Sequence, residues 1–129
     1  MVFNITTTKT NRYYYFNAML GGERVGKVCV DLDSEDANRY VKAYGGKWAK
    51  IILVQTSTQY CKKGIATSLL NKVLETLGDY NLYLNVIPIK RDATDKDKSQ
   101  LVDFYSKFGF KKYDADICTT TMIRTIDEG

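Results

Sequence analysis

The sequence predicts a single domain of the α/β class, with a mixed sheet that is antiparallel at its start and parallel at its centre. Two observations lead to this prediction. Strand-like runs at 13–20 and 24–32 flank Gly21-Gly22, a dipeptide typical of a tight hairpin. An amphipathic segment at 63–77 lies between two apolar runs, and the order strand, helix, strand favours a right-handed parallel crossover. No repeat or linker divides residues 1–129.

The N-terminal runs have the composition of strands. Tyr and Phe dominate 13–20, and valines recur in 24–32; aromatic and β-branched residues favour a pleated, half-buried surface. A shorter strand is expected at 2–7. The chain therefore opens with antiparallel β structure.

A short helix is expected at 34–44, between the hairpin and the next strand. Ser34 can cap its start, and the acidic residues that follow suit the positive end of a helix dipole. Ala37, Tyr40, Val41 and Tyr44 recur at helical spacing, and Gly45-Gly46 ends the pattern.

The central unit has the clearest pattern. The apolar run Ile51-Ile52-Leu53-Val54 within 48–56 predicts a strand that is buried on both faces. The helix at 63–77 repeats its apolar residues every 3.6 positions, and Gly78 is expected to cap its end. A strand at 82–87 completes the unit.

The C-terminal part is expected to return to the sheet. Residues 88–98 are polar and charged and predict a loop, and 99–108 predict a helix that Gly109 ends. Two β segments, 110–113 and 117–126, finish the chain.

Composition excludes several chemistries. The chain has no histidine, which rules out a Ser/His/Asp triad, a Cys/His pair and histidine metal ligands, and we expect no metal. The chain has three cysteines, Cys29, Cys61 and Cys118, which are widely spaced. An odd number at such spacing favours reduced thiols in a cytosolic protein. The net charge of +4 suits an anionic ligand; its cations are scattered, so we expect no nucleic-acid partner.

The sequence shows no targeting or membrane segment. The N-terminus lacks the basic and apolar regions of a signal peptide, and no stretch approaches the roughly 18 apolar residues of a membrane span. We expect a cytoplasmic protein without a membrane partner.

The loop before the central helix has the features of an anion site. Free backbone amides at a helix N-terminus attract phosphates, Gly64 and Ala66 allow a ligand to approach closely, and Lys62 and Lys63 add positive charge. The simpler interpretation is that the two small residues only pack the helix against the sheet. The loop lacks the G-x-x-x-x-G-K-[ST] pattern of a P-loop.

A second segment favours the ligand-binding interpretation. Phe104-Tyr105-Ser106-Lys107-Phe108-Gly109-Phe110 resembles the F-Y-x-K-x-G-F signature of the GNAT N-acetyltransferases, and Cys61-Lys62-Lys63-Gly64-Ile65-Ala66 resembles their [Q/R]-x-x-G-x-[G/A] cofactor loop. The resemblance covers about 48–113 closely and the flanking strands loosely. It implies the GNAT fold, in which the central parallel strands splay apart.

The resemblance also implies roles for individual residues. The donor would be acetyl-CoA, with its pantetheine arm along the strand end and its pyrophosphate on the loop amides. Tyr105 would be the general acid that protonates the leaving thiolate, because a phenol is protonated at neutral pH. The residues implied in cofactor binding are Gln55, Thr56, Ser57, Cys61, Lys62, Lys63, Gly64, Ile65, Ala66 and Thr67.

The sequence departs from the family pattern in several places. Cys61 stands where the family has Gln or Arg, so one side-chain contact near the phosphates is lost. No acidic residue on the central strands is an evident general base, which leaves water or a carboxylate such as Asp31, Asp33 or Glu35. Only residues 8–12 fill the place where family members have two acceptor-binding helices, so the acceptor site is either more open or completed by a partner chain, as in a homodimer.

The function that these observations favour is acetyl transfer to a primary amine, on a protein lysine, a protein N-terminus or a small molecule. The alternative is a non-catalytic GNAT-like module that binds CoA or another protein. Acetyl-CoA binding without turnover on any amine would favour the alternative.

Overall fold

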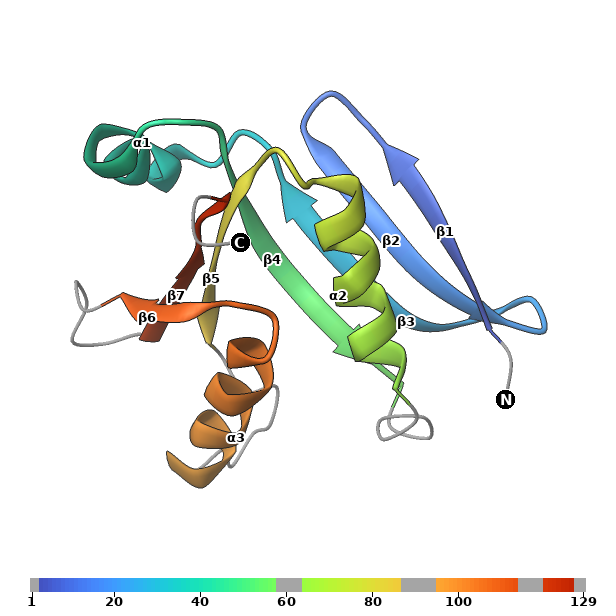
Figure 1. The fold of residues 1–129 in the computed structure, drawn as a ribbon. Helices are drawn as coiled ribbons and strands as arrows, with labels where there is room; N and C mark the ends of the chain where they lie inside the picture. Colours follow the sequence, from blue (N-terminus) through green and yellow to red (C-terminus); the bar gives the residue numbers. More distant parts are fainter. Residues whose placement is uncertain (1–2, 58–63, 87–94, 114–119, 127–129) are drawn as a thin grey trace.

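A computed structural model of the chain describes residues 3–57, 64–86, 95–113 and 120–126. Within these ranges the chain forms one seven-stranded sheet with the order β1-β2-β3-β4-β5-β7-β6 (Figure 1). The strands are β1 (Asn4–Lys9), β2 (Tyr13–Leu20), β3 (Glu23–Asp31), β4 (Trp48–Thr56), β5 (Asn81–Val86), β6 (Lys111–Tyr113) and β7 (Thr120–Arg124). The helices are η1 (Glu35–Ala37), α1 (Asn38–Tyr44), α2 (Ile65–Thr76) and α3 (Asp95–Ser106).

The antiparallel start and the parallel centre of the sheet are confirmed. β1, β2, β3 and β4 pair antiparallel in chain order, and Gly21 and Gly22 form the β2–β3 turn with positive φ angles of 57° and 84°. β4 pairs parallel with β5, and α2 connects them. The mixed α/β class therefore follows the sequence prediction.

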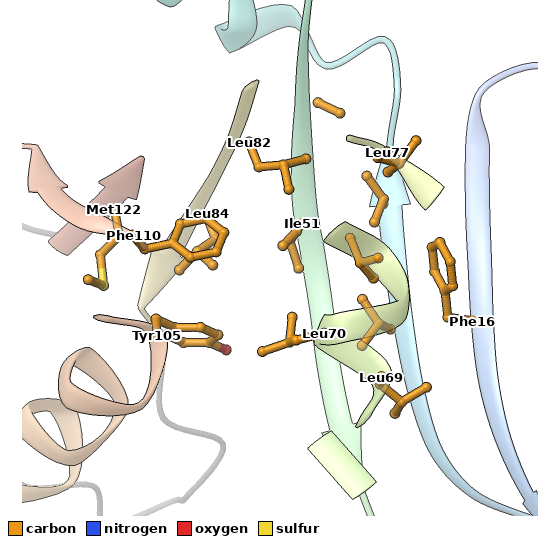
Figure 2. Close-up of a cluster of buried hydrophobic side chains, with 14 of the residues drawn as sticks. Phe16, Ile51, Leu69, Leu70, Leu77, Leu82, Leu84, Tyr105, Phe110 and Met122 are labelled. Atoms are coloured by element: carbon orange, nitrogen blue, oxygen red, sulfur yellow. The ribbon is translucent and has the colours of Figure 1, made fainter. Parts of the chain in front are cut away.

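The two faces of the sheet are covered differently. α2 and α3 lie on one face, here called the α2 face, over the main core that contains Phe16, Ile51, Leu69 and Leu84 (Figure 2). α1 lies on the opposite face, here called the α1 face, over a smaller aromatic cluster that includes Tyr40, Trp48 and Tyr83. Neighbouring residues of β5 alternate between the two clusters, as strand geometry requires.

The α2 face owes its close packing to one glycine of β3. A Cβ atom on Gly26 would lie 2.7 Å from Cγ2 of Ile65 and 3.0 Å from Cδ1 of Leu69. The first turns of α2 therefore rest directly on the β3 backbone. This contact fixes where the N-terminus of α2 lies relative to the beginning of β3 and the end of β4.

Three local predictions were wrong. α3 begins at Asp95, inside the predicted 88–98 loop, and ends at Ser106; its first turn is so polar that it carries no apolar repeat. Gly78 is not a left-handed cap: α2 ends at Thr76, its C-cap residue is Leu77 with a φ of −109°, and Gly78 has no positive φ. Ile52 is 46% exposed, so β4 is not buried on both faces along its whole length.

The predicted helix at 34–44 is divided. Ser34 precedes the short 3-10 helix η1, and α1 follows at Asn38. The Ser34 hydroxyl caps no backbone amide and donates instead to the Asp36 carboxylate. Gly45 ends α1 with a φ of 71°, as the sequence predicts.

Candidate functional site

The central feature of the site is a wedge between β4 and β5. The two strands pair only from Trp48 and Asn81 to Ile51 and Leu84. Their outer ladders continue further: β4 pairs with β3 up to Thr56, and β5 pairs with β7 up to Val86. The strands therefore separate while each keeps its other neighbour, and Figure 1 shows them diverging.

A bulge in β4 lies at the start of this wedge. Leu53 pairs with Cys29 and Ile51 pairs with Val30, so Ile52 is an extra residue in β4. Bulges bend a strand and increase its twist. The bulge thus gives a local reason for β4 to turn away from β5 directly after their last pair.

Within the described residues, the N-terminus of α2 is uncapped. Gly64 precedes the helix with φ 77° and ψ 11°, and the described part of the chain supplies no side-chain cap there. Apart from its chain neighbours, no described residue has a heavy atom within 4 Å of the position that a Cβ on Gly64 would occupy. The amides of Ile65, Ala66 and Thr67 therefore offer donors and the positive end of the dipole to an anion.

The predicted cofactor residues divide into three groups. Gly64, Ile65, Ala66 and Thr67 form the start of α2, where Ile65 is buried in the core, Ala66 is partly exposed, and Gly64 and Thr67 are exposed. Gln55, Thr56 and Ser57 line a cavity at the end of β4. Cys61, Lys62 and Lys63 lie outside the described residues.

That cavity has a volume of about 290 Å³ and is lined by the beginning of β3 and the end of β4. Its walls are Arg24, Val25, Gly26, Lys27, Gln55, Thr56 and Ser57. The register explains the grouping, since Lys27 pairs with Gln55 and the Ser57 amide donates to the Val25 carbonyl at 2.9 Å. Sequence analysis missed Arg24 and Lys27; only the hairpin register shows that they meet the end of β4.

Tyr105 lies on α3 at the border of the wedge. It is 8% exposed, and its ring packs edge-on against Phe104 and Phe110. Its hydroxyl points toward Leu70 of α2 (Figure 2) and has no hydrogen-bond partner in the described part of the chain. Burial raises the pKa of Tyr105 to about 12, so the phenol stays protonated.

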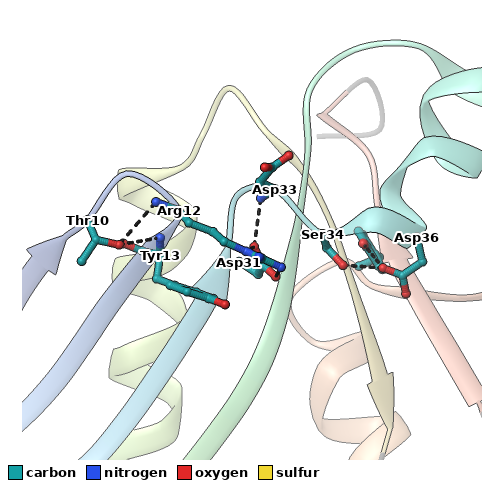
Figure 3. A network of polar contacts seen from close by, with 8 residues as sticks. Thr10, Arg12, Tyr13, Asp31, Asp33, Ser34 and Asp36 are labelled. Atoms are coloured by element: carbon teal, nitrogen blue, oxygen red, sulfur yellow. Dashed lines mark hydrogen bonds and ion pairs between the residues drawn. The ribbon is translucent and has the colours of Figure 1, made fainter.

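The candidate base Asp31 is already engaged. Its two carboxylate oxygens each accept a bond from Arg12 at 3.0 Å, and the backbone amide of Asp33 donates to it at 2.9 Å (Figure 3). Burial alone would raise the pKa of Asp31, but these bonds outweigh burial and hold the pKa below its ordinary value. A carboxylate held in this way is a weak base.

A second carboxylate network lies on the α1 face, and sequence analysis missed it. Asp36 accepts from the Tyr83 hydroxyl at 2.8 Å, from the Lys50 ammonium at 3.1 Å and from Ser34. Burial opposes ionisation, but the bonds from Ser34, Tyr83 and Lys50 bring the pKa of Asp36 down to about 2. Lys50 and Tyr83 are register partners, which is a signal that only the β4–β5 pairing reveals.

The α1 face is sparsely covered. β1 ends at Lys9 and β2 begins at Tyr13, so the short link between them leaves no room for helices there. The helices of this face come instead between β3 and β4 and pack on the beginning of β4 and β5. Tyr13 and Tyr15 of β2 remain partly exposed. The α1 face beside the separated ends of β4 and β5 therefore carries no large covering element among the described residues.

The described ranges contain neither a metal-binding cluster nor a membrane-spanning helix. No group of three or more His, Cys, Asp or Glu residues there could hold a metal ion. None of the helices in the same ranges has the length and apolar character needed to cross a bilayer.

Comparison with known proteins points to one family. The family model described as "Acetyltransferase (GNAT) family" matches residues 3–110 of this chain. No curated protein sequence gives a significant match.

Solved structures with a similar fold include acetyltransferases. A Pyrococcus horikoshii protein has a TM-score of 0.65 and 27% identity over 85% of this chain and 63% of its own. The PaiA N-acetyltransferase of Thermoplasma acidophilum, solved with coenzyme A, has a TM-score of 0.60 and 19% identity over 88% of this chain and 61% of its own. This chain thus spans less than two thirds of the length of both proteins.

A third similar structure holds a bisubstrate analogue. It is an Arabidopsis thaliana protein in complex with the bisubstrate analogue CoA-Ac-MVNAL, with a TM-score of 0.60 and 20% identity. The match covers 86% of this chain and 72% of that protein.

Proposed function

This chain belongs to the acetyltransferase (GNAT) family, and from that premise we propose that it transfers an acetyl group from acetyl-CoA to a primary amine. One observation carries the proposal. The β4–β5 ladder stops at Ile51 and Leu84 while both outer ladders continue, and the open N-terminus of α2 follows β4. A wedge beside an anion site suits a long ligand with phosphates at one end.

The residues present fit acetyl-CoA. The pyrophosphate would accept bonds from the first-turn amides of α2, where Gly64 leaves open space. Unpaired backbone groups of β4 beyond Ile51 would bond to the amides of the pantetheine arm, as a neighbouring strand would. Arg24 and Lys27 bring two positive charges to the cavity at the end of β4. The Thermoplasma acidophilum structure, which holds coenzyme A, supports this assignment.

Acetyl-CoA supplies an acyl group activated as a thioester. In the proposed reaction the acceptor nitrogen forms a bond to the acyl carbon while the bond from that carbon to sulfur breaks. The amine loses one proton to water or to a base, and the sulfur gains one from the Tyr105 hydroxyl. Two observations support this role: the raised pKa of about 12 keeps the Tyr105 phenol protonated at neutral pH, and its hydroxyl has no partner among the described residues.

The acceptor would approach from the α1 face. α2 and α3 cover the opposite face over the main core, whereas α1 covers only the beginning of β4 and β5. This open approach favours an acceptor of peptide size. The bisubstrate analogue bound by the Arabidopsis thaliana protein, which joins CoA to the sequence MVNAL, supports a peptide acceptor.

Titration calorimetry with acetyl-CoA tests the first half of the proposal. We expect saturable binding of acetyl-CoA and CoA and much weaker binding of ATP, because ATP lacks the pantetheine arm that would pair with β4. Comparable affinity for ATP, or no binding at all, would overturn the cofactor assignment.

An acceptor screen tests the second half. Release of free CoA thiol would be followed with a peptide bearing a free α-amine, a peptide bearing only a lysine amine, and a polyamine. Turnover on one of them supports the enzyme. Binding of acetyl-CoA without turnover on any amine would favour the non-catalytic module instead.

A further inference from the structure

Asn85 is the first residue of β5 beyond the last pair with β4. The ladder between the two strands ends at Ile51 and Leu84. The residues that follow on each strand are Ile52, which is the exposed bulge residue, and Asn85. Strand alternation places Asn85 on the same face as Tyr83, which is the α1 face. Asn85 therefore lies at the mouth of the wedge, on the side from which the acceptor would approach.

The orientation of the Asn85 amide is fixed from β7. Asn85 and Thr121 are register partners, and the Thr121 hydroxyl donates to Oδ1 of Asn85 at 3.0 Å. Thr121 is 1% exposed, so water cannot replace this bond. A buried hydroxyl needs a partner, and this amide oxygen is the partner that it has in the described structure. Thr121 thus holds the amide in one of its two orientations.

The nitrogen of the Asn85 amide is left to donate. No described residue accepts a bond from it, and the side chain is only partly buried. β5 lies between β7 and β4 in the sheet. An amide whose oxygen is held on the β7 side directs its nitrogen away from β7, toward the wedge. Two N–H donors therefore face a place where a ligand would come.

We propose that Asn85 is the acceptor-positioning residue, and that its amide N–H groups bind a carbonyl oxygen adjacent to the reacting amine. This inference rests on the proposed acetyl transfer and names its substrate class. In a peptide N-terminus the first carbonyl is bonded to the same α-carbon as the amine. The Asn85 amide could therefore bind that oxygen while the amine lies between β4 and β5. A lysine side chain or a polyamine has no carbonyl close to its amine. The acceptor class is therefore an α-amine with a neighbouring carbonyl.

A pair of acceptors tests the assignment directly. Asn85→Ala should lower kcat/KM for alanyl-glycinamide roughly five- to tenfold, which is the contribution of one neutral hydrogen bond. It should leave kcat/KM for n-butylamine, which lacks a carbonyl, and the Kd of acetyl-CoA unchanged. An equal loss with both amines would overturn the proposal, because the residue would then not read the carbonyl.

Thr121 supplies the matched control for orientation. Thr121→Val keeps the volume and removes the hydroxyl. It should therefore raise KM for alanyl-glycinamide by part of the increase that Asn85→Ala causes. Thr121→Ser, which keeps the hydroxyl, should restore it. In the Asn85→Ala background, Thr121→Val should have no further effect on KM. A full additional loss there would show that Thr121 acts through the fold and not through Asn85.

A binding measurement keeps the proposal testable even if no amine is turned over. The side-chain NH₂ resonances of Asn85 can be identified by their loss in Asn85→Ala. With CoA bound, titration of alanyl-glycinamide should shift them, and n-butylamine should not. Acetyl-CoA binding without turnover would sink the proposed reaction alone, whereas unshifted resonances would sink the role of Asn85.

Discussion

Tyr105 shows how burial sets the chemistry of a single side chain. Its ring lies among Phe104, Phe110 and the core side chains around Leu70, and this burial raises its pKa to about 12. A proton donor must carry its proton at the working pH, and this phenol does so with a wide margin. The same rise in pKa makes Tyr105 a weaker acid than an ordinary phenol, so proton donation requires the thiolate to form within hydrogen-bond reach of its hydroxyl.

Removing the hydroxyl of Tyr105 tests that role. Tyr105→Phe should lower kcat by about 100-fold, at the lower end of what general acid catalysis contributes. The Kd of acetyl-CoA and the unfolding midpoint should stay within experimental error, because the hydroxyl has no hydrogen-bond partner in the described chain. Turnover and calorimetry on the same preparation make the comparison. Unchanged kcat would remove Tyr105 from the proton transfer.

The raised pKa of Tyr105 also predicts the alkaline side of the pH profile. Its group is an acid whose pKa lies above the ordinary value of about 10, so it stays protonated as pH rises from about 7 to 10. We therefore expect kcat to show no descending limb from Tyr105 in that interval. A fall in kcat near pH 8 that disappears in Tyr105→Phe would contradict the assignment.

Among the elements, α2 is the one whose position decides the anion site. Its start depends on two glycines with different tasks. Gly64 provides a left-handed φ and open space at the N-terminus, and Gly26 provides the close approach of β3 to Ile65. One glycine is needed for its backbone conformation and the other for its missing side chain.

A pair of isosteric substitutions at Gly64 isolates the charge at this site. Asn and Asp both tolerate the left-handed region, and a Cβ at this position would meet no described atom within 4 Å apart from the chain neighbours. Gly64→Asp should weaken acetyl-CoA binding at least about tenfold more than Gly64→Asn, because a negative charge would lie near the phosphates. Titration calorimetry of both variants gives the ratio. Equal affinities would mean that the phosphates lie elsewhere.

Gly26→Ala should disturb the packing of α2. Its Cβ would lie 2.7 Å from the β-branched Ile65 side chain, which cannot turn away at small cost. Overpacking of this kind costs about 1–3 kcal/mol of unfolding free energy, measured by denaturant titration. Combining it with Ile65→Ala removes the clashing Cγ2 atom. The double variant should lose less unfolding free energy than the sum of the losses in the two single variants. If the losses are simply additive, the contact between residue 26 and Ile65 is not the cause of the destabilisation.

The elements follow closely from local sequence, whereas their mutual geometry does not. The β2–β3 hairpin, the β4–α2–β5 unit and the open start of α2 were predictable because glycines and apolar periods mark them. The beginning of α3 was not, because Asp95 to Lys98 are all charged. Asn85 and Thr121 lie 36 residues apart in sequence, and Asp36 and Tyr83 lie 47 residues apart, so each pair meets only in the folded sheet. No local pattern contains that information.

At the scale of the whole molecule, the α1 face depends on charge as well as on packing. The network of Asp36, Lys50 and Tyr83 joins η1 to the paired ends of β4 and β5. It lies beside the aromatic cluster of Tyr40 and Trp48. The helical segment between β3 and β4 is therefore attached to the sheet by bonds that need an ionised carboxylate.

This dependence predicts how stability changes in acid. The pKa of Asp36 is lowered in the folded chain to about 2, so its contribution is present above the unfolded value of about 4 and is lost as pH falls toward 2. The thermal midpoint of Asp36→Asn should therefore lie below that of the wild type at neutral pH, and the gap should close between about pH 4 and 2. Asp79→Asn is the control, because its ion pair with Lys47 is exposed on both sides and should contribute little at any pH. A gap for Asp36→Asn that stays constant down to pH 2 would mean that the carboxylate charge does not hold η1 to the sheet.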